Sequence, residues 1–284
     1  MKKLAIASLF LMFASYCIAQ DSTQKWKPSV GINFTSVPTT HISGTDTSFQ
    51  NALSVGPFFS IRSHGGFGVV YSPVFVAGGS KSGIFMHIIT IGLEQYDREN
   101  FDLVAEYSHF FFTNNTSIPW SPISNEVILA ATYKKFWIRP KISAGFGFGT
   151  NNEVSPSTQA YDIELAAGIS HSFEWELNHL NFNVTPSVLV NAGTNEYFSF
   201  LSLNRYISHS KKFSKYIKNP RGKSGGGNSL PQIISVNNLE LNLESSLDKG
   251  SFSIRPAASL FVPISSTSNS GLDGYWELAL TYNF

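Results

Sequence analysis

The amino-acid sequence predicts an all-β fold, a transmembrane antiparallel up-and-down β-barrel of about 12 strands, with a range of roughly 10–14. Long segments alternate between apolar and polar residues, and the connections between them alternate between short and long. Charged residues make up only 14% of the chain, against roughly 25% in an ordinary soluble domain. No segment approaches the roughly 18 consecutive apolar residues of a transmembrane helix.

The start of the chain is typical of an export signal. Lys2 and Lys3 precede a short apolar run, and small residues end this region at Ala19. This pattern predicts a signal peptide over residues 1–19, cleaved on export, and a barrel over residues 20–284.

The single cysteine, Cys17, lies inside the predicted signal. Bulky Tyr16 precedes it, which disfavours lipid attachment at Cys17 and favours cleavage after Ala19. The mature chain would then contain no cysteine, which excludes disulfides, thiolate catalysis and cysteine-based metal sites.

Removal of Lys2 and Lys3 with the signal peptide leaves 18 basic against 19 acidic residues, a net charge of −1. Such a chain lacks the basic surface of a nucleic-acid-binding protein.

The alternation is clearest over 161–177 and again over 180–191, where one face is apolar and the other polar. Most segments have about ten residues or more, which exceeds the usual soluble strand and matches the roughly 9–11 residues that cross a bilayer. The segment 84–96 is the least regular. The predicted strands are 25–37, 51–62, 67–77, 84–96, 101–112, 125–134, 138–148, 160–176, 180–192, 233–247, 251–264 and 275–284.

The connections differ between the two ends of the predicted barrel. Those after even-numbered strands are tight turns, whereas most of those after odd-numbered strands are long and rich in Ser, Thr, Asn, Gly and Pro. Tight turns on the periplasmic side and long external loops are typical of outer-membrane barrels. The long connections are 38–50, 113–124, 149–159, 193–232 and 265–274.

Barrel size indicates which face points outward. About eight strands already leave an interior that side chains just fill, so a soluble barrel of about 12 strands would be hollow. The polar face also consists chiefly of Ser, Asn, Gly and Thr. Both observations favour apolar residues toward lipid and polar residues toward an enclosed lumen.

Aromatic residues gather at both strand ends, as expected for rings at the membrane interfaces. Those at the tight-turn end are Trp26, Phe67, Phe101, Trp137, Trp175, Phe252 and Tyr282. Those near the long loops are Phe34, Phe75, Phe85, Phe111, Phe146, Tyr161 and Trp276.

The last segment alternates and ends in phenylalanine, with Trp276, Leu278, Leu280, Tyr282 and Phe284 on one face. It resembles the C-terminal assembly signal of bacterial outer-membrane β-barrels. The resemblance implies an outer-membrane location in a Gram-negative bacterium and recognition by the barrel-assembly machinery. It identifies no particular family among these barrels.

By alternation, the lumen would hold charges of both signs, with acids in excess. This arrangement allows two interpretations: a polar pore that favours cations or neutral solutes, or ion pairs across the lumen that close it. The candidate lumen residues are Lys27, Arg62, Asp102, Glu106, Arg139, Lys141, Asp162, Glu164, Glu240, Glu244, Arg255 and Glu277.

The sequence offers weak support for catalysis and implies no metal or cofactor. Some twelve-stranded outer-membrane phospholipases use a Ser/His pair on their outer face, but His171 and Ser172 are adjacent and would point to opposite faces. His41 and Ser43 have same-face spacing within a predicted loop. An outer-membrane lipid hydrolase is therefore the least favoured function.

The connection 193–232 is long and basic. Within 196–231, seven Lys and Arg residues stand against Glu196 alone. We expect either a constriction folded into the pore or a basic surface for lipopolysaccharide phosphates or a partner protein; a mobile solvated loop is the alternative. Its candidate contact residues are Arg205, Lys211, Lys212 and Lys215.

The predicted function is a narrow channel for small polar solutes, not an enzyme. The alternative is a non-conducting barrel that anchors or assists a surface or secretion complex. The expected partners are outer-membrane lipid and lipopolysaccharide, the assembly machinery, and in the second case a protein at the extracellular loops.

Overall fold

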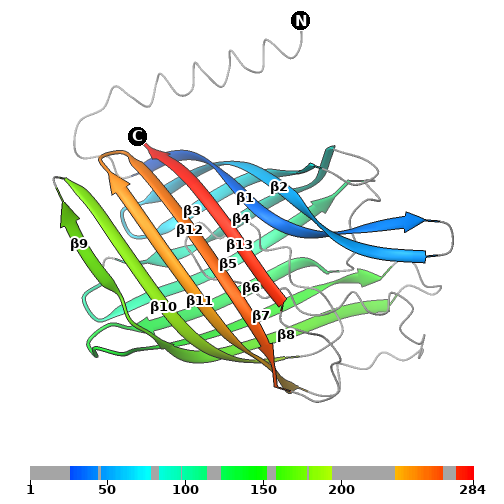
Figure 1. The fold of residues 1–284 in the computed structure, drawn as a ribbon. Coiled ribbons are helices and arrows are strands. Elements are labelled where there is room, and N and C mark those ends of the chain that lie inside the picture. Colours follow the sequence, from blue (N-terminus) through cyan, green and yellow to red (C-terminus); the bar gives the residue numbers. More distant parts are fainter. Residues whose placement is uncertain are drawn as a thin grey trace, which may run out of the picture.

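The structure is a computed structural model, and it describes residues 26–43, 46–77, 83–96, 98–113, 123–151, 158–177, 179–193, 234–264 and 273–284. Long strands dominate these residues (Figure 1). The predicted signal peptide and the connection 194–233 lie outside the described residues.

The strands agree closely with the periodicity of the sequence. Twelve predicted strands correspond to the 13 elements of the structure because the predicted strand 160–176 is divided into two collinear pieces, β8 and β9. The elements are β1 (Trp26–Ser43), β2 (Asp46–Ser63), β3 (Phe67–Ala77), β4 (Gly83–Gln95), β5 (Phe101–Phe112), β6 (Ile123–Tyr133), β7 (Arg139–Asn151), β8 (Thr158–Ser170), β9 (Phe173–Leu177), β10 (Leu180–Gly193), β11 (Ser235–Lys249), β12 (Phe252–Pro263) and β13 (Asp273–Asn283).

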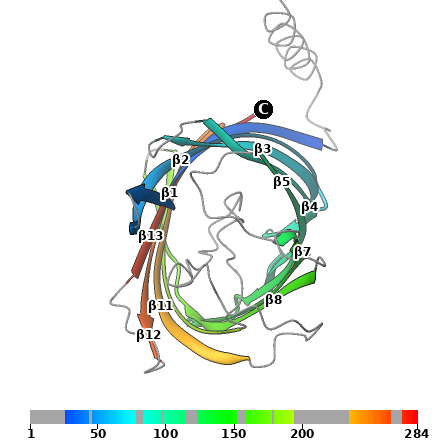
Figure 2. The ribbon, with the colours of Figure 1, turned by 90° about the vertical axis from the view of Figure 1, so that its right-hand side faces the viewer.

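The sheet closes on itself. Every strand pairs with its neighbours in antiparallel fashion, β1 pairs with β13, and β10 pairs with both β8 and β11. Figure 2, which looks along the barrel, shows the strands as a ring. The fold is therefore a closed antiparallel barrel of 12 strands, as the sequence predicts. Among the described residues, only the short piece β9 pairs on one side alone, with β10.

The division between β8 and β9 has a local cause. Ser187 pairs with Ser170 and Val184 pairs with Phe173, so the intervening His171 and Ser172 face Pro186 and Thr185. Pro186 has no N–H to donate to the ladder. Its carbonyl oxygen still accepts a hydrogen bond from the His171 backbone N–H, at 3.2 Å. The strand is therefore interrupted here without a change of register.

The two faces of the sheet separate by polarity. Serine, threonine, asparagine and acidic side chains at alternate positions are buried inside, while large apolar side chains at the intervening positions are exposed outside. All seven aromatic residues predicted for the tight-turn end are exposed. This outward apolar surface is the one that a transmembrane barrel presents to lipid.

Two expectations about the long-loop end are wrong. Residues 38–50 were expected to form a loop, but β1 and β2 continue as a paired ribbon to Ser43 and Asp46. Phe85 was expected in the outer aromatic band, but it is only 3% exposed. A bulge between Val74 and Phe75 pairs these residues with Met86 and Ile84, and Phe85 is the extra residue that this irregularity turns inward.

Candidate pore lumen

One side of the lumen is lined by a polar network on β10, β11 and β12. The Asn191 side-chain amide donates to Asn238 Oδ1 at 2.9 Å and to Glu240 Oε2 at 3.0 Å. The Ser259 hydroxyl donates to Glu240 Oε1 at 3.0 Å. These contacts hold the Glu240 carboxylate against the wall, because both of its oxygens receive hydrogen bonds from neighbouring strands.

The opposite side, formed by β2 to β6, carries a cluster of buried apolar side chains among its polar ones, which corrects the expectation of a uniformly polar lumen. Its buried side chains lie at the inward positions of the alternation, next to inward polar residues such as Ser60, Ser72 and Thr90. They make a core inside the barrel, and they comprise Phe58, Val70, Val74, Val76, Met86, Ile88, Val104, Phe110 and Ile128.

This interior core gives a direct prediction for two adjacent residues. Phe110 is 2% exposed inside the barrel, whereas Phe111 is 48% exposed on its outer face. Phe110→Ala should cost roughly 3–5 kcal/mol of unfolding free energy because it leaves a cavity among packed side chains. Phe111→Ala should cost less than half as much, since one side of that ring contacts only the surroundings. Urea titration of the barrel in lipid vesicles, followed by tryptophan fluorescence, measures both variants; equal losses would contradict the assignment of an interior core.

At the tight-turn end, Arg62 and Glu94 form an ion pair between β2 and β4. Glu94 is 2% exposed, so its charge is compensated chiefly by this guanidinium. Arg62 Nη1 also donates to the carbonyl of Gly66 at 3.1 Å, and the Glu94 N–H donates to the same carbonyl at 2.9 Å. Gly66 occupies this turn with φ of 91°, a conformation that glycine adopts without strain. Arg62 thus ties the turn between β2 and β3 to the end of β4.

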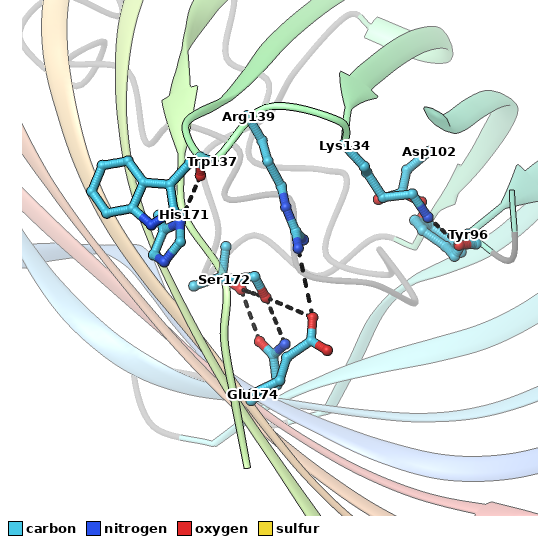
Figure 3. A network of polar contacts seen from close by, with 10 residues as sticks. Tyr96, Asp102, Lys134, Trp137, Arg139, His171, Ser172 and Glu174 are labelled. Carbon is cyan, nitrogen blue, oxygen red and sulfur yellow. Dashed lines mark hydrogen bonds and ion pairs between the residues drawn. The ribbon is translucent and has the colours of Figure 1, made fainter. Parts of the chain in front are cut away.

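Further ion pairs continue around the same end (Figure 3). Lys134 lies 2.8 Å from Asp102 and donates to the Tyr96 carbonyl at 2.8 Å. Arg139 reaches toward Glu174, with 3.7 Å between nitrogen and oxygen. Removal from solvent raises the pKa of the Tyr96 phenol well above its ordinary value. This phenol therefore adds no charge to the rim at physiological pH.

Two longer pairs lie nearby. Lys141 is 4.0 Å from Glu244, and Arg255 is 3.9 Å from Asp248. These ion pairs all lie toward the tight-turn end of the barrel. Lys27 lies at the rim and is exposed. Glu106 packs directly over Gly92: a Cβ added at Gly92 would lie only 2.7 Å from the Glu106 Cγ.

The loop half of the barrel carries acids. Glu126 of β6 and Glu164 of β8 lie on either side of β7, whose Gly145 leaves room for both carboxylates: a Cβ there would be 3.7 Å from Glu164 Oε2 and 4.0 Å from Glu126 Oε1. Asp162 is buried beside Gly147, and Glu240 and Glu277 lie further around the wall.

The charges are therefore layered along the barrel axis. Within the described residues, every lysine and arginine lies in a tight turn or within three residues of the strand end beside one. Three acids of the loop half, Glu126, Asp162 and Glu240, are buried, and Glu164 is partly buried. Such layering favours cations at the loop entrance of a pore.

Sequence reasoning missed some partners in this arrangement. Glu94 and Lys134, which pair with the predicted Arg62 and Asp102, were not among the candidates. Glu94 follows the irregular run of isoleucines in β4, where alternation is weakest, and Lys134 lies beyond the end of its strand. The predicted contacts of the loop 193–232, Arg205, Lys211, Lys212 and Lys215, lie outside the described residues.

The C-terminal strand occupies the closing seam between β12 and β1. Trp276, Tyr282 and Phe284 are exposed on the outer face, and the Phe284 N–H donates to the Pro28 carbonyl at 3.1 Å. The last residue is thus tied to the first strand. Recognition of this strand by the assembly machinery stays a prediction.

His171 and Ser172 take separate partners. His171 Nδ1 donates to the Trp137 carbonyl at 2.6 Å, whereas the Ser172 hydroxyl contacts Thr185 at 3.1 Å and accepts from Asn183 at 2.6 Å (Figure 3). This arrangement does not orient His171 as a base for Ser172. His41 and Ser43 lie on β1 and not in a loop, which corrects the prediction.

Two further absences concern only the residues that the structure describes. No three His, Cys, Asp or Glu side chains there are grouped to hold a metal ion. No helix there is long and apolar enough to cross a membrane.

Comparison with known proteins yields similarity in structure only. No family model matches the sequence, and no curated protein matches it. Among solved structures, Acinetobacter baumannii OccAB1 has 8% sequence identity and a TM-score of 0.32, over 92% of this chain and 80% of that one. A deletion mutant of TodX, a monoaromatic hydrocarbon channel, has 10% identity and a TM-score of 0.32, over 94% and 91%. A porin has 10% identity and a TM-score of 0.25, over 90% and 100%. At these identities and TM-scores the comparisons assign no family to this chain.

Proposed function

We propose that this protein is a Gram-negative outer-membrane channel that passes small polar solutes and prefers cations. The supporting observation is the closed barrel with an apolar exterior, in which acids line the loop half and all described bases lie at the tight-turn end. Tight turns in the periplasm and loops outside then place the acidic half at the external entrance. The interior core and the ion pairs occupy part of the cross-section, so the pathway is narrow.

The experiment is single-channel recording of the purified barrel in planar bilayers. We expect steady, small unitary currents and a reversal potential in a salt gradient that indicates preference for cations. Changing Glu126, Asp162 and Glu164 together to their amides should lower the cation-to-anion permeability ratio about threefold or more, because the external entrance loses its charge. Glu99→Gln, in the turn between β4 and β5, is the matched control and should leave the ratio unchanged. Silent membranes containing folded barrel would refute the channel.

A second candidate function is a non-conducting barrel that anchors a partner complex. The observation that favours it is the apolar interior on β2 to β6, where Val74, Met86, Ile88 and Phe110 are almost completely buried. The same recordings separate the two candidates, and deletion of 196–228 tests whether the loop 193–232 constricts the pore. Currents that rise on deletion would support a constricted channel; silence in both forms would support the anchor.

A further inference from the structure

The hairpin of β9 and β10 extends past the tight-turn end of the neighbouring strand β7. The last pair between β7 and β8 is Arg139 with Ser170, yet the strand continues through β9 to Leu177, seven residues further. At the other junctions between neighbouring strands on this rim, the longer strand passes the last pair by at most three residues. Figure 1 shows β9 lying beside β10 at one end of the barrel.

β9 therefore has an open edge. Among the described residues it pairs with β10 alone, through the five pairs from Phe173–Val184 to Leu177–Leu180. All five of its residues are exposed. The backbone N–H and C=O groups on the edge away from β10 thus form a short template for another strand, and such edges in natural proteins are usually covered, charged or used for binding.

The edge is stiffened by aromatic contacts on one face. Phe173 stacks with Trp175 at a centroid distance of 6.1 Å, and Trp175 stacks with Phe182 of β10 at 5.4 Å. His171 contacts both Phe173 at 4.4 Å and Trp137 at 4.5 Å, which anchors the base of the hairpin to the turn before β7. The hairpin is consequently held in a fixed orientation, so an incoming strand would meet a preformed edge.

The opposite face of β9 is acidic. Glu174 and Glu176 alternate with the aromatic residues, and Glu174 is 66% exposed beside Arg139. A strand added to this edge would set its own alternating side chains beside these two faces. Lysine or arginine would lie beside the carboxylates, and apolar residues beside Phe173, Trp175 and Leu177.

A second copy of the barrel fits this edge poorly. Two copies inserted in one membrane with the same orientation have β9 strands that run in the same direction, which excludes antiparallel pairing between them. Any pairing of β9 with itself would also bring carboxylates together at Glu174 and Glu176, and like charges on adjacent strands are destabilising.

We propose that β9 is a strand-addition site for an extended segment of a periplasmic protein in which basic and apolar residues alternate. The chemistry is β-augmentation, in which main-chain hydrogen bonds supply affinity and alternating side chains supply specificity. The periplasmic location rests on the membrane orientation proposed above, whereas binding to the edge does not depend on conduction.

The probe is a fluorescent peptide of about eight residues that alternates lysine and valine and is blocked at both ends, titrated against the barrel in lipid nanodiscs, where both rims are accessible. We expect saturable binding by anisotropy. Glu176→Lys should weaken binding about fivefold or more, whereas Glu99→Lys, the same charge change at the same rim but away from the edge, should change it less than about twofold. Retention of the heat-modifiable band on gels confirms that both variants are folded.

Two further peptides distinguish strand addition from simple attraction of charge. A lysine–valine peptide with N-methylated backbone nitrogens on one edge keeps its charge but loses ladder hydrogen bonds, and should bind at least about tenfold more weakly. A glutamate–valine peptide should bind the double variant Glu174→Lys/Glu176→Lys and not the wild type.

Equal binding of the methylated and unmethylated peptides, or equal effects of Glu176→Lys and Glu99→Lys, would overturn the proposal. Self-association of the wild type that Trp175→Lys abolishes would assign the edge to a second copy and also overturn it. If the barrel conducts ions but fails these binding tests, only the strand-addition site is refuted. If it binds the peptide as expected but does not conduct, only the channel is refuted.

Discussion

Arg62→Met should destabilise the barrel by roughly 3–5 kcal/mol, because it leaves the Glu94 carboxylate buried without its counter-ion. The same change removes the hydrogen bond from Arg62 to the Gly66 carbonyl, which holds the turn between β2 and β3. Urea titration in lipid vesicles, followed by tryptophan fluorescence, measures the loss.

Two further variants distinguish the cost of a buried, unpaired charge from the cost of lost side-chain packing. The double variant Arg62→Met/Glu94→Gln should recover most of the stability, since no buried charge then lacks a partner. Arg139→Met removes a guanidinium from the same rim, but its partner Glu174 is largely exposed, so the expected loss is about 1 kcal/mol or less. If Arg62→Met and Arg139→Met cost the same, the Arg62–Glu94 pair is not buried in the folded protein.

Gly31→Ala should prevent proper closure of the barrel, with a loss on the order of 4 kcal/mol or more. Gly31 lies on β1 between Phe58 of β2 and Thr281 of β13, at the seam that joins the two ends of the chain. A Cβ at this position would overlap the Phe58 ring and the Leu280 carbonyl oxygen. The fraction of heat-modifiable, folded barrel after refolding into vesicles measures the effect.

Gly274→Ala is the matched control on the C-terminal strand β13, because a Cβ there meets its nearest atom, the Ser259 carbonyl oxygen, at an ordinary 3.6 Å. It should fold like the wild type. Gly31→Ala/Phe58→Ala should recover part of the loss, since it removes the ring but leaves the carbonyl in place. Normal folding of Gly31→Ala would show that the seam is looser than the structure indicates.

The strand pattern was predictable because the two faces of most strands meet different surroundings. In β8 to β10, polar residues such as Asp162, Asn183 and Asn191 alternate with apolar ones, so period two is visible in the sequence and places the faces correctly. The exposed aromatic band at the tight-turn end was predictable for the same reason, since rings recur at one end of successive strands.

The remaining features depend on contacts that alternation does not encode. In β4, Ile88 points inward and Ile91 outward, and both are isoleucine, so no local signal separates an interior core from a lipid-facing surface. The inward turn of Phe85 depends on a bulge opposite β3, and the interruption at His171 depends on a proline in the next strand. The Arg62–Glu94 pair joins residues 32 positions apart, which only the strand register brings together.

The ribbon formed by the ends of β1 and β2 gives the molecule a projecting arm. Pairing of β1 with β13 ends at Thr35 and pairing of β2 with β3 ends at Leu53, whereas β1 and β2 pair with each other as far as Ser43 and Asp46. The eight residues 36–43 correspond to a reach on the order of 25 Å. With the loop end facing outward, as proposed above, an antibody epitope inserted in place of Gly44 and Thr45 should therefore be recognised on intact cells.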